Sequence, residues 1–553
     1  MHANQTRIAL RFWRQFAKIA LVLEAWISKV RSYCLKFLRE PPYRIGAVAI
    51  LVVAACFACF FVLFTLSNPI VDDYHFRQSQ TAIGIYYAIH EGAVITYETP
   101  VLGLPWSAPF EGPIYQSFVA GLVTVTGMDI VPAGRIVSFG FLLGTIYFGQ
   151  LILRLLLPGD RIVALLFATL MLTSPLYLFW GRATLIETTA IFFGTAWLYA
   201  AMRATRYKDV VLAAVALPLC ALAALAKMTT WPTFVSAYGL FWLFERRRGI
   251  SVFRSEFWIL ISGVTAALVG SIAWIEFSDE IKSTGPLTSY LTSNDLTEWN
   301  FGSIFQRFSS QLWLETLPNR MLPDILGWFW FLVLFIPSHL TLRGRYFIIT
   351  VANILLFFIP ITLFANLHLV HAYYQTANAL FLIAGAAIAL AGLVSQGHIR
   401  LTAGVLLLII FGQAASFLGG YWPKAVRDMR NDQKYRLARY INEAIPPEAA
   451  LVVVGIDWSS VLHFYSERKG LAVPGWIPKD VLVRFLEDPA TLLGSKQVGA
   501  VVFCEISGLE PNASIKQLID RYRVVIAREA SNGGHIAKFD YCTVYTSPHI
   551  RSH

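Results

Sequence analysis

Long apolar runs alternate with short polar segments along most of the chain. The runs lie at about 45–67, 135–157, 162–180, 187–202, 209–226, 231–244, 257–276, 325–340, 345–365, 375–395 and 400–418. A helix of about 20 apolar residues crosses the hydrocarbon core of a bilayer, and shorter or tilted helices are tolerated. The pattern therefore predicts an α-helical polytopic membrane protein with about eleven transmembrane helices.

One further apolar segment, 113–127, does not fit this series. It carries Gln116 and ends at Gly127. Counting it as a span would place the later basic clusters on the wrong side of the membrane. We interpret it as a helix that lies on, or dips into, the outer surface.

The basic residues indicate how the helices are oriented. With a cytoplasmic amino terminus, the loops that face the cytoplasm hold Arg154, Arg161, Arg203, Arg206, Lys208, Arg246, Arg247, Arg248, Arg343, Arg345 and Arg400. Cytoplasmic loops of membrane proteins carry an excess of Lys and Arg. We expect a multi-pass protein of the inner (plasma) membrane, with a transmembrane domain over 45–420 and outer loops at 68–134 and 277–324.

Both ends of the chain differ from the middle. Residues 1–44 combine nine Lys and Arg with aromatic residues, which predicts a basic amphipathic segment on the cytoplasmic leaflet; a disordered basic tail is the alternative. Residues 421–553 have the pattern of an α/β domain outside the membrane. We expect strands at Leu451–Val454 and Ala500–Cys504, helices at Ser459–Glu467, Lys479–Glu487 and Ser514–Arg523, and β-rich segments near Val524 and Tyr541.

Composition supports the membrane class. Of 553 residues, 56% are hydrophobic and 14% charged, whereas soluble domains carry roughly a quarter charged residues. The net charge of +11 is spread in short clusters between apolar runs, which argues against nucleic-acid binding. The six Cys form no cluster of metal-site spacing, and only Cys504 and Cys542 are candidates for a disulfide. No phosphate-binding glycine motif is present.

The most unusual stretch follows the first apolar run and reads NPIVDDYHFRQSQTA, from Asn68 to Ala82. Asp72 and Asp73 are expected at the membrane surface, where a partly desolvated carboxylate can act as a base or a metal ligand. An ordinary polar loop between two helices is the alternative interpretation.

The predicted topology gathers the other polar residues on the same outer face. They are His75, Arg77, Glu98, Glu111, Arg182, Glu187, Lys227, His368, His371, Tyr373 and Tyr374. Carboxylates beside cations suit a substrate with a phosphate and a lipid tail, because the cations hold the phosphate while a carboxylate removes a proton from an attacking hydroxyl or amine. Snorkelling to headgroups is the alternative for each cation.

Four of these segments resemble motifs of the GT-C superfamily of polyprenyl-phosphate-sugar-dependent glycosyltransferases, in the branch of protein O-mannosyltransferases and lipid A aminoarabinose transferases. Asp72-Asp73 is similar to the acidic pair of the first outer loop. Phe110 to Tyr115, FEGPIY, is similar to a Phe-Glu-Lys-Pro-Pro-Leu-Tyr segment, with Gly112 in place of Lys. SPLY from Ser174, followed by Arg182 and Glu187, resembles the second outer loop, and His371 to Tyr374 resembles His-x-Tyr-Tyr.

The resemblance implies an enzyme that moves a sugar from a polyprenyl-phosphate carrier to a lipid, glycan or protein acceptor on the outer face. It implies catalytic roles for Asp72 as base, with Asp73, Glu111 and Glu187. The donor phosphate is expected to meet Arg77, Arg182, Lys227, His371, Tyr373 and Tyr374. We expect no resident cofactor or metal, although some members use a divalent cation. A transporter or flippase of lipid-linked sugars, and an assembly protein, are the alternatives.

Overall fold

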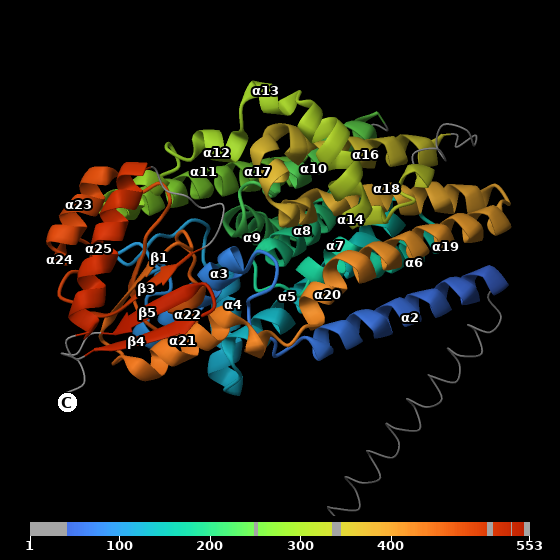
Figure 1. Cartoon of the computed structure of the whole chain (residues 1–553). Helices are drawn as coiled ribbons and strands as arrows, with labels where there is room; N and C mark the ends of the chain where they lie inside the picture. Colours follow the sequence, from blue (N-terminus) through green and yellow to red (C-terminus); the bar gives the residue numbers. More distant parts are fainter. Residues whose placement is uncertain (1–40, 248–252, 334–343, 506–512, 532–533, 547–553) are drawn as a thin grey trace, which may run out of the picture.

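The computed structural model describes residues 41–247, 253–333, 344–505, 513–531 and 534–546. The predicted amphipathic segment 1–44 lies outside the described residues except at its last four positions. Most of the chain forms a helix bundle, drawn in Figure 1. Its main helices are α2 (Pro42–Phe64), α5 (Ile130–Leu156), α6 (Ile162–Thr173), α8 (Glu187–Tyr207), α9 (Val210–Ala226), α10 (Trp231–Arg246), α11 (Ser255–Ser283), α16 (Arg345–Leu363), α18 (Thr376–Ser395) and α19 (Ile399–Ser416).

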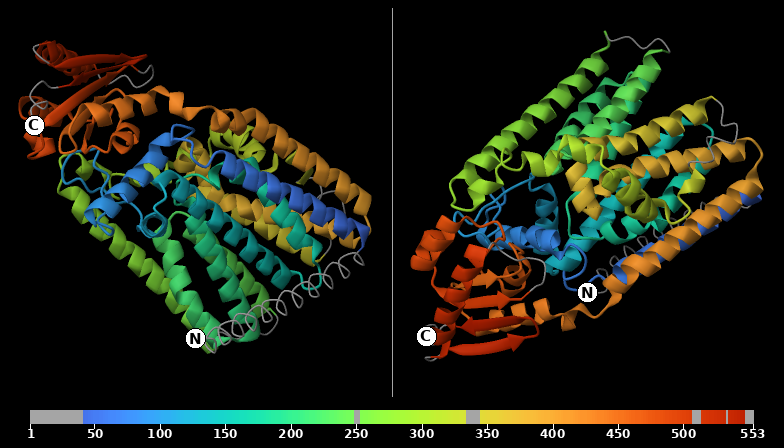
Figure 2. Two further views of the ribbon diagram at one scale, coloured as in Figure 1. Left: turned by 90° about the horizontal axis from the view of Figure 1, so that it is seen from below. Right: turned by 45° about the horizontal axis from the view of Figure 1, so that its top comes forward.

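Within the described residues, six helical stretches are long and apolar enough to cross a membrane. They are α2, α5, α11, α16, the stretch Ala372–Ser395 that contains α18, and the stretch Ile399–Val426 that contains α19. The predicted helical membrane class is confirmed, whereas the count of eleven spans stays a prediction. The stretch around α18 is 94% buried, because its small Ala and Gly residues allow other helices to pack on all sides. Figure 2 shows α2 and α19 side by side, and Phe61 packs edge-on against Phe417.

Three predicted helix boundaries differ from the structure. The predicted helix 162–180 is divided into α6 and α7 (Pro175–Trp180), because Pro175 has no N–H to continue the α6 ladder. The helix predicted at 257–276 continues to Ser283, where Asp279 and Lys282 form an ion pair of 2.7 Å within one turn. The helix predicted at 325–340 is interrupted at Gly327, whose φ of +74° ends α14 (Leu322–Leu326); residues 334–340 lie outside the described part.

Among the described residues, four of the basic loops predicted to share one side are joined by side-chain contacts. The Arg206 guanidinium at the end of α8 bonds the Leu155 carbonyl and the Glu245 carboxylate, at the ends of α5 and α10. Asp160 accepts a hydrogen bond of 2.7 Å from Tyr346 at the start of α16. The opposite end of the bundle carries α3 (His75–Glu91), α4 (Ile114–Thr126) and the carboxyl-terminal domain (Figure 1).

The carboxyl-terminal domain is built on a five-stranded mixed sheet of order β2-β1-β3-β5-β4. Its strands are β1 (Ala450–Val454), β2 (Gly470–Ala472), β3 (Val498–Cys504), β4 (His535–Phe539) and β5 (Cys542–Thr546). Helices α21 (Gln433–Ala444) and α22 (Val461–Ser466) lie toward the bundle, and α23 (Lys479–Glu487), α24 (Ala490–Leu493) and α25 (Ala513–Ser531) lie on the far side (Figure 1). Cys504 and Cys542 face each other on β3 and β5 and form a disulfide.

One predicted element of this domain is wrong. The β-rich segment expected near Val524 is part of α25, whereas the one near Tyr541 is β5. Val524 and Val525 are β-branched and favour strands by propensity, but α25 has a strong apolar face that packs against β4 and β5. Both valines stay more than half exposed, so the packing of their neighbours determines the helix.

The first outer loop is joined to this domain by backbone pairing. The Gly470 and Ala472 amides of β2 donate to the Pro100 and Val101 carbonyls at 3.0 and 2.7 Å, and the Gly103 amide donates to the Gly470 carbonyl at 3.1 Å. Residues 100–103 thus cover the β2 edge of the sheet. Gly103 has a φ of +74°, and a Cβ there would lie 2.6 Å from the Leu492 carbonyl oxygen. Loop and domain therefore share one hydrophobic core.

Candidate active site

The segment that carries Asp72 and Asp73 is held from both sides. Arg135 of α5 donates to the carbonyls of Leu66 and Asn68 at 3.0 and 2.7 Å, and so satisfies groups left free where α2 ends. The Asn68 side chain donates to the Ala425 carbonyl at 2.9 Å. The two hydrogen bonds from α5 and the one to Ala425 hold the chain in place just before Asp72 and Asp73.

Asp72 is enclosed by the helix bundle. Its Oδ2 lies 3.3 Å from an Arg182 nitrogen, and its Oδ1 accepts a hydrogen bond of 2.8 Å from Gln78. The Asp72 and Arg182 side chains are each only 1% exposed. The guanidinium also packs over the rings of Phe61 and Phe179, each 4.9 Å away. Burial lowers the pKa of Arg182 to about 10, which leaves it charged at neutral pH.

Asp73 turns to the other side and meets α20 (Trp422–Val426), the segment that leads into the carboxyl-terminal domain. Its Oδ2 accepts from Lys424 Nζ at 2.6 Å, and the two side chains are 31% and 52% exposed. The residues on either side of the two aspartates are held by the chain that follows α20. The Lys434 Nζ lies 2.9 Å from His75 Nε2, and Arg427 donates to the Val71 carbonyl at 3.0 Å.

His75 is kept neutral by these contacts. Its Nε2 accepts from the Lys434 ammonium, and its Nδ1–H donates to the Asp72 carbonyl at 3.3 Å. Burial, together with the charge on Lys434, lowers the pKa of His75 to about 4. The imidazole therefore acts as a fixed link between Lys434 and the backbone of Asp72.

Arg77 and Glu111 form the second acid–base pair of the site. One Arg77 nitrogen reaches both Glu111 oxygens at 2.8 and 2.7 Å, and Gln80 Oε1 accepts from Arg77 at 3.1 Å. Burial alone lowers the pKa of Arg77, but Glu111 and neighbouring tyrosines raise it above the usual range. Arg77 is 24% exposed, so it is the most accessible of the predicted phosphate-binding arginines.

Glu187 and Lys227 form the third pair. They lie 2.6 Å apart, with side chains 4% and 3% exposed, and the ammonium sits 3.7 Å from the Tyr374 ring centre. Gly112, which stands where the resembling family has Lys, donates its backbone N–H to Leu225 at 2.9 Å, two residues before Lys227. The position of the missing lysine thus lies beside the chain that carries Lys227.

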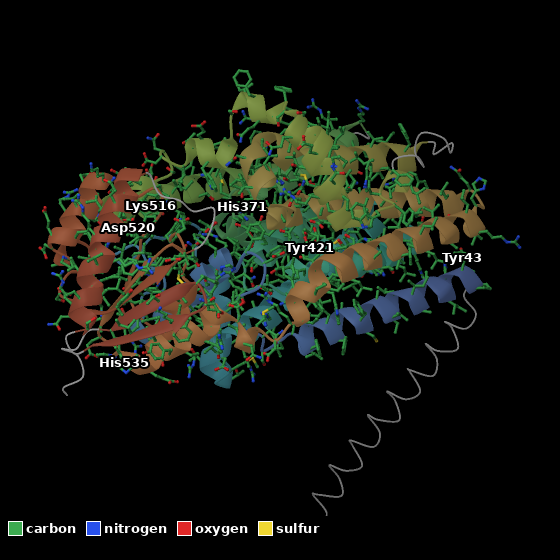
Figure 3. All side chains as sticks on the ribbon, in the orientation of Figure 1. Tyr43, His371, Tyr421, Lys516, Asp520 and His535 are labelled. Carbon is green, nitrogen blue, oxygen red and sulfur yellow. A yellow bond between two sulfur atoms is a disulfide. The ribbon has the colours of Figure 1, made fainter. Side chains whose placement is uncertain are left out.

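His371, Tyr373 and Tyr374 lie beside the second and third pairs. The His371 ring stacks on Tyr373 and Tyr374 at 5.1 and 5.6 Å, and Tyr74 meets Tyr373 edge-on at 5.3 Å. Figure 3 shows His371 in the middle of the molecule, far from Tyr43 at the outer end of α2. Burial and the charge of Lys227 lower the pKa of His371 to about 3. It is therefore available as a neutral hydrogen-bonding group rather than as a cation.

Sequence reasoning did not select the polar lining beside Arg77 and Glu111. A small cavity there is also lined by Gln80, Tyr97 and Gln116. Gln80 Nε2 and Gln116 Oε1 are buried without a hydrogen-bond partner among the described residues. The presence of Gln116 in an otherwise apolar segment was a signal that could have identified it. The free space of about 10 Å³ suits one water molecule, so the site is closed in this conformation.

The described residues do not form a divalent metal site. No group of three or more His, Cys, Asp or Glu side chains among them is close enough to hold a metal ion. Asp72, Glu111 and Glu187 each pair with a different cation, so their carboxylates do not converge. We therefore derive no step through a metal, and the expectation of no resident metal stays a prediction.

Comparison with known proteins gives a fold relationship only. No protein-family model and no curated protein matches the chain. Among solved structures, the chain resembles ArnT from Cupriavidus metallidurans bound to undecaprenyl phosphate, with a TM-score of 0.57, 12% identity, and coverage of 91% of this chain and 97% of that one. It also resembles the archaeal oligosaccharyltransferase AglB from Archaeoglobus fulgidus, in complex with an inhibitory peptide and a dolichol-phosphate. There the TM-score is 0.50, the identity 12%, and the coverage 83% and 69%.

These likenesses extend over the bundle and, for ArnT, over nearly the whole of both chains. At 12% identity they establish the arrangement of helices and leave the residue roles open. The resemblance seen in the sequence is confirmed at the level of the fold: this chain is a helical multi-pass membrane protein whose helices are arranged as in ArnT and AglB.

Proposed function

We propose that the protein is an integral-membrane glycosyltransferase that moves a sugar from a polyprenyl-phosphate carrier to a lipid, glycan or protein acceptor on the outer face of the membrane. The observation that carries the proposal is the set of two acid–base pairs around Tyr373 and Tyr374, Arg77–Glu111 and Glu187–Lys227, together with the buried Asp72–Arg182 pair. It occurs in a fold whose solved relatives hold undecaprenyl phosphate or a dolichol-phosphate.

The donor phosphate carries the charge that the site has to stabilise. During transfer the bond between the anomeric carbon and the phosphate oxygen breaks, and its electron pair stays on the departing phosphate. Arg77 and Lys227 supply positive charge for that anion, together with neutral hydrogen bonds from Tyr373, Tyr374 and His371. Arg182 is the most deeply buried of the three cations, and it pairs with Asp72, our proposed base. We therefore rank it after Arg77 and Lys227 as a phosphate ligand.

Asp72 is our proposed base, and Asp73, Glu111 and Glu187 assist. The acceptor hydroxyl or amine attacks the anomeric carbon from the face opposite the phosphate, and this direction of attack inverts the anomeric configuration. The base takes the proton of the attacking group. Each Asp72 oxygen already accepts one hydrogen bond, and a carboxylate oxygen can accept a second. Because Asp72 is 1% exposed, acceptor binding has to open the site.

The sugar itself needs hydrogen-bonding groups that are not charged. Gln80 and Gln116 present an amide donor and an amide acceptor without partners, next to the Arg77–Glu111 pair. Such buried amides are costly unless a ligand satisfies them. We assign them to hydroxyl groups of the donor sugar.

The outer-face location rests on the basic loops at the opposite end and on the Cys504–Cys542 disulfide, because disulfides persist in oxidising compartments. Cysteine labelling in intact cells tests it. Cys34 and the free cysteines Cys56, Cys59 and Cys220 are first replaced by Ser. An impermeant reagent is expected to label Ser514→Cys and to spare Ser251→Cys in the predicted cytoplasmic loop. The reverse result would contradict the orientation and the outer-face site.

The function is tested with purified protein in detergent against a panel of polyprenyl-phosphate sugars. We expect release of polyprenyl phosphate and a glycosylated acceptor, and loss of both in Asp72→Asn. A transporter needs two compartments and gives no product in detergent. Absence of product with every donor and acceptor, from protein that still binds a polyprenyl phosphate, would favour the transporter alternative.

A further inference from the structure

A second cavity lies outside the proposed active site. It has a volume of about 730 Å³ and is bounded by the end of α3, the corner between α4 and α5, the segment Ser67–Pro69, and helices α21 and α22. None of the predicted catalytic or phosphate-binding residues lines it. Its size is in the range of ligand pockets, and no step of the proposed transfer uses it.

The cavity is lined by charges of both signs. Arg430 and Arg439 lie on the domain side, and Asp129 lies on the bundle side at the start of α5. All three are exposed, and none of them forms an ion pair with another described residue. Opposite charges around one cavity, too far apart to pair, suit a ligand that itself carries both charges.

Aromatic rings complete the wall between these charges. Tyr435 and Arg439 are one helical turn apart on α21 and both line the cavity. Tyr435 packs edge-on against Tyr465 at 4.9 Å. Across the cavity, Tyr86 stacks with His90 at 4.1 Å and donates to Glu467 at 3.1 Å. Tyrosine faces attract an organic ammonium, so the lining provides for a cation as well as for a phosphate.

The position of the cavity points to a lipid. Helix α2 ends at Phe64, α4 ends at Thr126 and α5 begins at Ile130, so three apolar helix ends meet beside it. Leu63, Phe64 and Val125 are exposed there by 68%, 55% and 85%. Exposed apolar side chains at the end of membrane helices contact acyl chains, and the level just beyond them is that of the headgroups.

We propose that this cavity binds the headgroup of a zwitterionic phospholipid of the outer leaflet. Arg430 and Arg439 hold the phosphate, and Asp129 with the tyrosine rings holds the ammonium. The acyl chains lie along the exposed ends of α2 and α4. The inference does not depend on the proposed transferase activity, because it concerns residues outside that site and is tested by binding alone.

Native mass spectrometry of the purified full chain measures the binding. The probes are phosphatidylethanolamine, phosphatidylglycerol, which has the phosphate without the ammonium, and soluble O-phosphoethanolamine. We expect retention of phosphatidylethanolamine in preference to phosphatidylglycerol, and weak retention of the soluble compound. Equal binding of the two lipids would overturn the ammonium site. Binding of O-phosphoethanolamine as tight as that of the lipid would overturn the assignment to a membrane lipid.

Three variants separate the two charges. Arg430→Gln with Arg439→Gln should weaken both lipids roughly 10- to 100-fold, the loss expected for charge-assisted hydrogen bonds. Asp129→Asn should remove the preference for phosphatidylethanolamine and leave phosphatidylglycerol binding intact. Ile89→Trp fills the cavity without changing charge and should weaken both lipids.

Arg436→Gln, on α21 outside the cavity, is the matched control and should bind like the unmodified protein. Unchanged lipid binding in both the double arginine variant and Ile89→Trp would overturn the proposal, and comparable gel-filtration profiles of all variants exclude misfolding as the cause of any loss.

Discussion

Asp72 and Asp73 are neighbours in the chain but belong to two different regions of the molecule. Asp72 faces the helix bundle, is 1% exposed and pairs with Arg182, whereas Asp73 faces α20 at the entry to the carboxyl-terminal domain, is 31% exposed and pairs with Lys424. A buried pair is costly to break because one charge is left unpaired in the interior. An exposed pair contributes little to stability and exchanges easily with water. The bundle side therefore sets a rigid geometry, and the domain side supplies an adjustable one.

The largest expected effect tests which side carries the base. Asp72→Asn should lower turnover by roughly 10²–10⁴-fold, the usual contribution of a general base, with donor binding largely intact. Asp73→Asn should cost less. If Asp73→Asn or Glu187→Gln abolishes transfer while Asp72→Asn keeps a near-normal rate, the base is not Asp72.

A second variant separates catalysis from structure. Asp72→Asn leaves the Arg182 guanidinium buried without its partner, which by itself can disturb folding. Asp72→Asn combined with Arg182→Gln removes the unpaired charge. A base cannot be recovered in this way, so turnover should stay low although thermal stability improves. Recovery of turnover in the double variant would show that Asp72 has a structural role only.

The next effect concerns the phosphate cations. Arg77→Ala and Lys227→Ala should each weaken donor use by about 1.5–3 kcal/mol, the value of a hydrogen bond to a charged group. The measurement is kcat/KM as a function of donor concentration, with expression level as a check on folding. Arg77→Lys keeps the charge but has no planar fork for Glu111, so partial activity is expected. Lys538→Ala, on exposed β4, is the control. Unchanged donor dependence in both alanine variants would move the phosphate site to Arg182 and His371.

The sequence predicted the helices well but not their pairing. The apolar runs fixed α2, α5, α8, α9 and α16 to within a few residues, because a membrane helix is specified by length and hydrophobicity. The acid–base partners are separated by 34, 40 and 110 residues along the chain, for Arg77–Glu111, Glu187–Lys227 and Asp72–Arg182. No local sequence pattern encodes such contacts. The sequence therefore predicted that the candidate residues lie on one face of the membrane, but not which carboxylate pairs with which cation.

The contact between the first outer loop and the carboxyl-terminal sheet was also beyond sequence reasoning. Residues 100–103 pair with β2 through backbone groups, which every residue except proline carries in full. The sequence therefore indicated a separate domain from 421 onward. In the structure, Ile70, Val71, Val101 and Leu102 share a core with the strands of that domain. The loop approaches Leu492 of α24 closely at Gly103, whose φ of +74° favours glycine.

A smaller effect is expected from the domain side of the comparison. Lys434→Met removes the donor to His75 and should lower kcat by roughly 3- to 10-fold, the equivalent of one hydrogen bond. The KM for the donor should not change, because Lys434 does not touch the phosphate cations. Lys434→Arg should restore most of the rate, and Lys538→Met is the control. A rise in KM without a change in kcat would show that the domain acts on donor binding instead of on the position of Asp72.

The last expected effect is a pH dependence of stability, without a direct effect on turnover, that arises from His75. Its pKa is about 4 in the folded protein and 6.5 in an unfolded chain, so between these values the unfolded chain binds a proton that the folded protein excludes. Stability is therefore fully present above pH 6.5 and is lost as the pH falls toward 4. At pH 5.5 the loss from this residue should be about 1.4 kcal/mol. His75→Gln, which keeps an acceptor for Lys434, should flatten the fall in thermal unfolding temperature between pH 7.5 and 5.5. His535→Gln, on exposed β4, should leave the slope unchanged. The same slope in His75→Gln as in the unmodified protein would show that the Lys434–His75 contact does not hold the imidazole neutral, and would remove the argument that this contact links the domain to the backbone of Asp72.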